Sequence, residues 1–138
     1  MGHNLDDSTQ RFADDLIANL KDGLDAQEIA AVDALPTGSA LLIVKRGASD
    51  GSRFLLDTDV TLAGRHPNAD IFLDDVTVSR KHVQFVRVGT RFEVKDLASL
   101  NGTYLNGSRI DLAPLANGDE VQIGKFRLTF YSSPADAR

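Results

Sequence analysis

The chain has 138 residues, enough for one folded domain with its own core and an additional segment. It contains no cysteine, which excludes a disulfide framework and a thiolate metal site and agrees with a reducing, cytoplasmic location. The longest apolar run, residues 40–44, is too short to span a bilayer, and the N-terminus lacks the order of a signal peptide, so we expect no membrane association.

Charge is distributed unevenly along the chain, whose formal net charge is −5. Residues 1–38 contain eight acidic and two basic residues, a net charge of −6, whereas residues 39–138 contain twelve acidic and thirteen basic residues, a net charge of +1. Such asymmetry is typical of an interaction tail attached to a domain. The lack of a basic excess argues against nucleic acid as a partner.

The first predicted element is a helix within the acidic segment. Its apolar stripe consists of Phe12, Leu16, Ile17 and Leu20. These residues recur at helical spacing, and Thr9 and Gly23 are placed to cap the start and the end of the helix.

A second short helix is predicted directly after the first. Asp25 and Glu28 have the spacing of a capping box, and the helical stretch ends near Leu35. Because short isolated helices are unstable in water, we expect residues 1–38 to form an acidic, marginally helical tail. The turn signal at residues 36–38 marks its boundary with the domain.

From residue 39 the apolar pattern changes to a period of two, which indicates β-strands. The runs are residues 40–45, 53–56, 60–63, 70–73, 82–88, 91–96, 103–105, 120–123 and 126–131. Turn signals separate them, and Asn106-Gly107 suits a tight primed turn because both central residues need positive φ. About ten to eleven short strands predict an all-β, antiparallel β-sandwich over residues 39–133, followed by a short tail at 134–138.

Three strand-breaking stretches are richer in hydrogen-bond donors than plain turns. They are Gly64-Arg65-His66-Pro67-Asn68, Ser79-Arg80-Lys81-His82, and Ser99-Leu100-Asn101-Gly102-Thr103 with Asn106 beyond it. A guanidinium meets a phosphate by two parallel hydrogen bonds, and hydroxyl and amide groups complete the cage. Together the three loops predict an anion site, although each loop alone is better interpreted as a turn with solvated charges.

Catalytic and metal-binding interpretations are weaker. Ser79 and His82 would be a nucleophile and a base, but no third residue orients the histidine and no nucleophile elbow surrounds the serine. The three histidines, at positions 3, 66 and 82, are scattered without metal-ligand spacing. We therefore expect no enzyme activity, no metal and no cofactor.

The combination G-R, S-R-x-H and N-G-T-x-x-N resembles the forkhead-associated (FHA) domain, a phosphothreonine-binding β-sandwich. The likeness covers about residues 39–132. It implies that Arg65 and Ser79 hold the phosphate, that Arg80 lies beside it, and that Asn101 bonds the main chain of the peptide. Thr77 and Val78 lie where such domains often contact the residue three positions after the phosphothreonine.

The resemblance also implies supporting roles around the site. His82 would brace the loop that holds Ser79. The remaining supporting residues would be Gly64, Gly102, Thr103 and Asn106. Lys81 receives no role from the resemblance and is interpreted as a solvated lysine.

Longer stretches resemble the GarA/OdhI family of small actinobacterial regulators. They include AGRHPNADIFLDDVTVSR, SLNGTY and NGDEVQIGKFRLTF. The resemblance implies a monomer whose partners are 2-oxoglutarate dehydrogenase and enzymes of glutamate metabolism. It also implies a serine/threonine kinase that phosphorylates the tail, which then binds its own FHA domain and releases the enzymes.

The tail supports this switch at one position. In the segment that matches the family, Ser8 stands where the family has a threonine, and Arg11 adds a positive charge that departs from the family pattern. Thr9 is therefore the expected phosphorylation site, and Ser8 is the lesser one. Phe12 follows Thr9 by three residues. An alternative is an FHA adaptor that docks a phosphorylated partner and does not inhibit itself.

Overall fold

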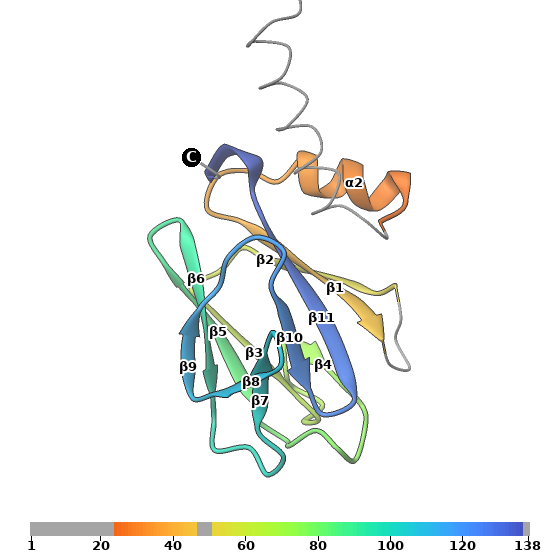
Figure 1. Ribbon diagram of the computed structural model, residues 1–138, viewed down its shortest axis with the longest axis vertical. Coiled ribbons are helices and arrows are strands. Elements are labelled where there is room, and N and C mark those ends of the chain that lie inside the picture. The colour runs from red at the N-terminus through yellow and green to blue at the C-terminus, as the bar shows by residue number, and fades with distance from the viewer. Residues whose placement is uncertain (1–23, 47–50, 137–138) are drawn as a thin grey trace, which may run out of the picture.

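The computed structural model describes residues 24–46 and 51–136, and its eleven strands form two packed sheets (Figure 1). The six-stranded sheet has the order β2-β1-β11-β10-β7-β8, and the five-stranded sheet has the order β4-β3-β5-β6-β9. The first sheet contains β1 (Ala40–Arg46), β2 (Arg53–Leu56), β7 (Thr103–Leu105), β8 (Ser108–Ile110), β10 (Glu120–Ile123) and β11 (Phe126–Ser132). The second contains β3 (Val60–Gly64), β4 (Ile71–Phe72), β5 (Val83–Val88), β6 (Arg91–Asp96) and β9 (Leu112–Pro114).

The predicted all-β sandwich is confirmed, with two differences in detail. The short strands β8 and β9 lie in a stretch that lacks an apolar alternation, so the sequence did not predict them. The pair β3–β4 is parallel, whereas the other ladders are antiparallel. This parallel pair is short, because it joins only Ala63 to Ile71 and Gly64 to Phe72.

The core lies between the two sheets, where the inward side of each strand is apolar. Strand β11 shows the alternation, since Phe126, Leu128 and Phe130 are buried while Arg127 and Thr129 are only half-buried on the outer face. Phe92 and Phe130 meet edge to face across the sheets, with ring centroids 6.0 Å apart. Aromatic rings prefer this arrangement, which adds to the free energy gained from burial.

The predicted capping box is confirmed at the start of helix α2 (Ala26–Asp33). The Asp25 carboxylate accepts a hydrogen bond from the backbone N–H of Glu28 at 2.7 Å, and the Glu28 carboxylate accepts one from the N–H of Asp25 at 3.1 Å. The helix is not marginal, because Val32 is buried in a second apolar cluster on the outer face of β1 and β11. The predicted helix between Thr9 and Gly23 lies outside the described residues.

Members of this second cluster come from three parts of the chain. They are Val32, Leu35, Leu41, Ile43 and Tyr131, with Leu24 and Ala31 packed against them. Burial of apolar surface is the main source of helical stability in a protein, and this contact supplies what an isolated eight-residue helix lacks.

Polar contacts fasten the segment that joins α2 to β1. The Asp136 carboxylate, in the short 3₁₀ helix η1 (Pro134–Asp136), accepts hydrogen bonds from the Thr37 hydroxyl and, at 2.7 Å, from the Gly38 N–H. The Ser133 hydroxyl donates to the Leu35 carbonyl at 2.7 Å. The hydrogen bond from Thr37 is the main reason that the pKa of Asp136 is lowered.

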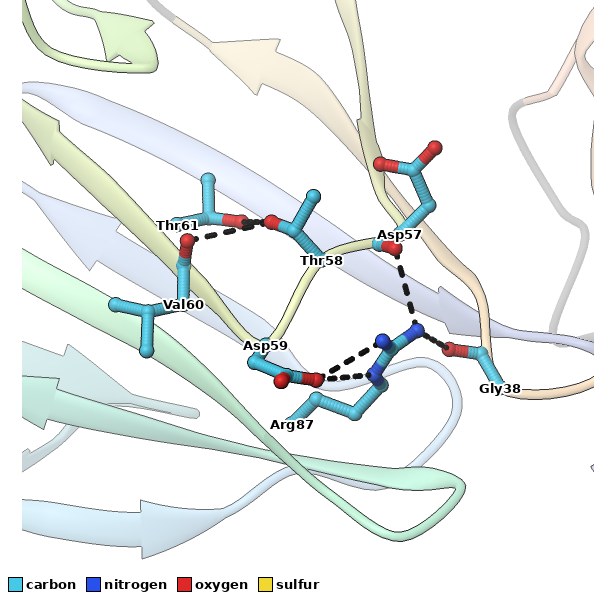
Figure 2. A network of polar contacts seen from close by, with 7 residues as sticks. All are labelled: Gly38, Asp57, Thr58, Asp59, Val60, Thr61 and Arg87. Atoms are coloured by element: carbon cyan, nitrogen blue, oxygen red, sulfur yellow. Dashed lines mark hydrogen bonds and ion pairs between the residues drawn. The ribbon is translucent and has the colours of Figure 1, made fainter.

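Arg87 on β5 completes this attachment, as Figure 2 shows. Its guanidinium donates to the Gly38 carbonyl at 3.1 Å, to the Asp57 carbonyl at 3.2 Å, and to the Asp59 carboxylate at 2.9 Å. One side chain therefore joins the helix linker to the β2–β3 loop. Packing against the domain thus begins near Leu24, earlier than the sequence pattern at residues 36–38 indicated.

The loops of the sandwich gather at two opposite ends (Figure 1). Helix α2 and η1 lie at one end, and the β3–β4, β4–β5 and β6–β7 loops lie at the other. The β7–β8 turn has the expected geometry, with φ of 49° at Asn106 and 89° at Gly107. The three stretches that the sequence singled out therefore share one end of the domain.

We expect Val32→Ala to destabilise the whole domain by about 1–3 kcal/mol, because it removes buried methyl groups from the contact between α2 and the sheet. Urea unfolding followed by circular dichroism measures the change. Gln27→Ala on the exposed side of the same helix serves as the control. If Val32→Ala unfolded with the same midpoint as the control, α2 would not be part of the cooperative domain.

Candidate functional site

The first part of the site is the end of β3, where Gly64 permits a close approach of two loops. A Cβ atom at Gly64 would lie 2.1 Å from the Arg80 carbonyl oxygen, so a larger residue would push the loops apart. The backbone N–H of Arg65 donates to the Ser79 carbonyl at 3.0 Å, and that of His66 donates to the Arg80 carbonyl at 3.1 Å. The β3–β4 loop is thereby joined to the β4–β5 loop.

The Arg65 guanidinium is bonded to the β4–β5 loop through its Nε atom. Its Nε donates to the Val78 carbonyl at 3.1 Å, and the side chain is half-buried. Among the described residues this is the only hydrogen bond of the guanidinium. Both Nη groups are therefore available to an anion in the bidentate geometry that guanidinium favours.

Ser79 lies on the β4–β5 loop and contacts the β6–β7 loop. Its Oγ accepts a hydrogen bond from the backbone N–H of Leu100 at 2.9 Å, and the hydroxyl keeps its own hydrogen for donation to a ligand. The Asn101 amide donates to the Thr77 carbonyl at 2.9 Å. These two contacts join the β4–β5 loop to the β6–β7 loop.

His82 is fully buried behind these loops and bonds both of them. Its Nδ1 accepts a hydrogen bond from the backbone N–H of Ser79 at 3.0 Å. Nε2 therefore bears the proton and donates to the Gly102 carbonyl, also at 3.0 Å. Burial lowers the pKa of His82, although the contact with Gly102 and the charge of Asp96 oppose this effect. The imidazole is a neutral brace between the loop of Ser79 and the loop of Asn101.

Asp96 organises the start of the β6–β7 loop. Its carboxylate accepts hydrogen bonds from the hydroxyl groups of Ser99 and of the buried Thr103, the latter at 2.6 Å. Burial raises the pKa of Asp96, but the hydrogen bonds from Ser99 and Thr103 outweigh burial and the net shift is downward. Thr103 thus supports the loop through Asp96.

Thr77 and Val78 have different surroundings from each other. The Thr77 hydroxyl donates to the Asp75 carboxylate at 2.5 Å and accepts from the Lys125 N–H at 2.9 Å. The Thr77 hydrogen bonds, with Lys125 next in importance, lower the pKa of Asp75 to about 2. Val78 was expected to face a peptide, but its side chain is 1% exposed and belongs to the core, so only its carbonyl contributes, by holding Arg65.

Asn106 lies farther along the chain and shapes a neighbouring turn. Its amide donates to the Asp119 carboxylate at 3.0 Å and accepts from the Glu120 N–H at 2.9 Å. Both partners belong to the turn before β10 or to its first residue. Asn106 therefore joins two segments of the six-stranded sheet, and these hydrogen bonds do not involve the loops of Ser79 and Asn101.

A hollow of roughly 330 Å³ opens beside Asn101. Its lining comes from Thr77, Asn101, Gly102, Tyr104, Gln122, Gly124 and Lys125. Gly124 lets the β10–β11 turn pack closely against Thr77. It has φ of +58°, and a Cβ there would lie 2.5 Å from the Thr77 hydroxyl. The sequence identified the turn at Gly124 but did not connect it with the site, because Gly124 is distant from the three motifs along the chain. Tyr104 lies within the third motif, but its residue type gave no sign that it lines the hollow.

Basic side chains lie around the loops, which also carry the acidic residues Asp70, Asp74 and Asp75. Arg80 and Lys81 are exposed, and the side chain of Arg109 lies against Gly102, where a Cβ would be 2.8 Å from the Arg109 Nε. Lys125 is paired with Asp75 at 2.9 Å. Arg80 follows Ser79 in the chain and adds positive charge beside an anion placed between Arg65 and Ser79.

The geometry does not make a catalytic pair of Ser79 and His82. The histidine ring contacts the backbone N–H of Ser79, not its hydroxyl, and both ring nitrogens are already bonded. Within residues 24–46 and 51–136 no group of three or more His, Cys, Asp or Glu residues is arranged to hold a metal ion. No helix among the described residues is long and apolar enough to cross a bilayer.

The pKa of His82 has a consequence for stability. The unfolded chain binds a proton near pH 6.5, whereas folded His82 resists protonation, so the free energy of unfolding should decrease as pH falls below 6.5. NMR titration should show the His82 ring still neutral where a free histidine is charged. His66→Gln should leave the pH-dependent loss of stability in place and His82→Gln should remove it. A His82 ring that titrated at 6.5 or above would contradict the brace described above.

Comparisons with known proteins agree with this geometry. The FHA domain family model matches residues 61–124. The glycogen accumulation regulator GarA of Mycolicibacterium smegmatis is 63% identical over 106 residues, which cover 77% of this chain and 67% of that protein. An oxoglutarate dehydrogenase inhibitor of Corynebacterium jeikeium is 54% identical over 133 residues, which cover 95% of this chain and 92% of that protein.

Solved structures show the same fold. One, from a study of phosphothreonine-dependent FHA domain interactions, has a TM-score of 0.65 and 29% identity and covers 70% of this chain and 98% of its own. Mycobacterium tuberculosis EmbR in complex with a low affinity phosphopeptide has a TM-score of 0.65 and 30% identity and covers 76% of this chain and 28% of its own. The chain therefore belongs to the FHA-domain family, together with GarA and the oxoglutarate dehydrogenase inhibitors.

Proposed function

We propose that this protein binds phosphothreonine through Arg65, Ser79 and Asn101 and regulates central metabolic enzymes. The observation that supports this most strongly is the joining of three loops around Ser79, with donors on each loop and a buried histidine behind them. Arg80 adds positive charge at the rim. These donors suit an anion, and both ring nitrogens of His82 are already bonded, so we propose a regulator and not an enzyme.

The partner class follows from the relatives. Two of them are named for their effects on metabolism, one as a glycogen accumulation regulator and one as an oxoglutarate dehydrogenase inhibitor. We propose that this chain, acting as a monomer in the cytoplasm, inhibits 2-oxoglutarate dehydrogenase and adjusts enzymes of glutamate metabolism. The high identity over nearly the full length of the inhibitor supports this assignment.

The proposal includes a switch in the tail. A serine/threonine kinase would phosphorylate Thr9, and Ser8 to a lesser extent, and the phosphothreonine would then occupy the site between Arg65 and Ser79. The phosphate adds about −1.5 to −2 charges to an already acidic segment. Because the tail is tethered, even a weak contact would compete with a separate enzyme.

The anchoring of α2 bears on this tether. Residues from Leu24 onward pack on the sheet, so only the preceding residues are available to reach the site. Thr9 and Leu24 are separated by a stretch that spans about 50 Å when extended and about 20 Å if the helix predicted from its sequence forms, whereas strand β11 is about 20 Å long. We therefore expect the tail to reach the three loops in an extended form.

The second candidate is an FHA adaptor that docks a phosphorylated partner, with the tail as a spacer. The fold alone supports the adaptor and the self-binding regulator equally, since the same loops would bind a phosphorylated partner or the phosphorylated tail. The behaviour of the phosphorylated tail separates the two.

Arg65→Ala should abolish inhibition of an actinobacterial 2-oxoglutarate dehydrogenase, because it removes the bidentate donor. Arg65→Lys keeps the charge without the planar fork and should weaken inhibition by about tenfold or more. Arg91→Ala is the control for net charge, because Arg91 pairs with Val88 at the end of β5 and β6 that is opposite to Val83 and Asp96. Full inhibition by Arg65→Ala, with the fold intact by circular dichroism, would refute the assignment of the site.

Kinase treatment of the full chain should shift the NMR amide signals of Arg65 and Ser79 and relieve inhibition of the enzyme. Thr9→Ala should prevent both effects, while Ser8→Ala should retain them. Unmoved amide signals in a wild-type chain phosphorylated at Thr9 would leave the adaptor as the function.

A further inference from the structure

A row of polar side chains crosses the outer face of the six-stranded sheet. Strand pairing places Gln122 on β10 beside Arg127 on β11. It also places Gln122 beside Tyr104 on β7, and Tyr104 beside Arg109 on β8. Residues directly opposite each other on neighbouring strands share one face of a sheet, and this face is the outer one because the adjacent Val121 is in the core. We call these four polar residues, Arg127, Gln122, Tyr104 and Arg109, the outer row.

The outer row lies between the anchor of α2 and the candidate site, on strands that join the two ends of the sandwich (Figure 1). Tyr131 belongs to the apolar cluster that receives Leu24, and it is four residues, about 13 Å, from Arg127 along β11. On the other side, Tyr104 lines the hollow with Asn101 and follows it by three residues, about 10 Å. A direct path from Leu24 to the candidate site therefore crosses the outer row.

The charges of the outer row suit a carboxylate. Arg109 is exposed, and 38% of the Arg127 side chain is exposed. Glu120 lies beside the row, and its carboxylate is 3.9 Å from the Arg127 guanidinium. An exposed ion pair contributes little free energy, so Arg127 can exchange Glu120 for another carboxylate.

The middle of the tail carries the matching charge. In the proposed switch, Leu24 remains on the sheet while the phosphate of Thr9 occupies the candidate site. Asp14 is five residues after Thr9, a span of up to about 17 Å. Asp15 is nine residues before Leu24, a span of up to about 30 Å. Both spans exceed the distances to the outer row, and these two acids are the only charged residues of the segment 12–20.

We propose that the outer row binds the carboxylates of Asp14 and Asp15 when phosphorylated Thr9 occupies the candidate site. Guanidinium groups pair with carboxylates through parallel hydrogen bonds, and the two arginines of the row present them from a rigid sheet. The inference rests on the proposed switch and adds to it a contact outside the loops. A separate protein that offers only a phosphothreonine gains nothing from the row, so the row favours the tail over such a competitor.

The test measures phosphopeptide binding to three full-length receptors by calorimetry. All three contain Thr9→Ala, Asp14→Asn and Asp15→Asn, so that their own tail does not compete for the site or for the row. The first has no other change, and the second also lacks the two arginines of the outer row, through Arg109→Gln and Arg127→Gln. The third is the matched control, which removes the same charge from exposed positions on β6, Arg91→Gln and Lys95→Gln.

Three synthetic peptides serve as ligands. Each comprises residues 3–20 and is phosphorylated at Thr9. One has the native sequence, and each of the other two lacks one acidic pair. The pairs are removed by Asp14→Asn with Asp15→Asn, or by Asp6→Asn with Asp7→Asn, which makes the same charge change on the other side of the phosphate.

On the first receptor and on the control, the native peptide should bind about fivefold tighter than the peptide without Asp14 and Asp15, the gain expected from two exposed ion pairs. On the receptor without the arginines this difference should disappear. The peptide without Asp6 and Asp7 should weaken as much as the native one does when the arginines are removed. Because the contact is electrostatic and exposed, roughly 0.5 M salt should also reduce the fivefold difference.

Equal weakening of all three peptides by loss of the arginines would mean that the arginines act on the phosphate, and it would overturn the row. Equal binding of the native peptide and the peptide without Asp14 and Asp15 to the first receptor would overturn the row and leave the phosphate site intact. Failure of every phosphopeptide to bind would overturn the proposed function and the row together.

A second measurement uses the whole switch. The full chain with Asp14→Asn and Asp15→Asn, phosphorylated at Thr9, should need about fivefold less protein for half-maximal inhibition of 2-oxoglutarate dehydrogenase than the phosphorylated wild type. The two unphosphorylated forms should inhibit equally, and mass spectrometry checks that both chains are phosphorylated to the same extent. A phosphorylated variant that released the enzyme as completely as the wild type would contradict the contact.

Discussion

The site depends on two hydrogen bonds made by one buried imidazole. His82 accepts from the N–H of Ser79 and donates to the carbonyl of Gly102, and these two groups belong to different loops, the β4–β5 loop and the β6–β7 loop. The imidazole must be neutral for this, because a charged ring has two donors and no acceptor. Burial keeps it neutral, so the core of the sandwich determines the geometry of a surface site.

The rest of the site extends this arrangement outward. Gly64 allows the β3–β4 loop to touch the Arg80 carbonyl, and Asp96 gathers the hydroxyl groups at the start of the β6–β7 loop. Each of these contacts satisfies a polar group that would otherwise be unpaired in a crowded region. The groups proposed to bind a ligand, among them the Nη atoms of Arg65 and the hydroxyl hydrogen of Ser79, make no hydrogen bond to the described residues. The same hydrogen bonds fix the loops to one another and leave the Nη groups of Arg65 without a partner among the described residues.

The opposite end of the sandwich has a separate role. Arg87 and Asp136 bind the two sides of Gly38, one through its carbonyl and the other through its N–H. Together with the apolar contact of Val32, they make α2 part of the domain. In the proposed switch, a tail that starts from this fixed point would have a defined reach, so the strength of self-binding would depend on the anchoring of a helix far from the phosphate. The contacts that fix α2 lie at one end of the sandwich, and the loops of the candidate site lie at the other end (Figure 1).

Patterns within a few residues were sufficient to predict much of this protein. The alternating runs identified most strands, Asp25 and Glu28 identified the start of α2, and Asn106-Gly107 identified a primed turn. The β8 and β9 strands were missed because Ser108–Ile110 and Leu112–Pro114 show no apolar alternation and are defined only by pairing with β7 and β6.

The sequence by itself determined the donors of the site, since Arg65, Ser79 and Asn101 belong to motifs whose residue types and order are typical of the FHA domain. Only the tertiary structure decided which side chains are buried and which line the surface hollow. Val78 and Thr77 are adjacent in the chain, yet one is in the core and the other lines the hollow with Tyr104 from another strand. The physical reason is that burial and partnership depend on neighbours in space, whereas propensity, capping and turn geometry depend on neighbours in the chain.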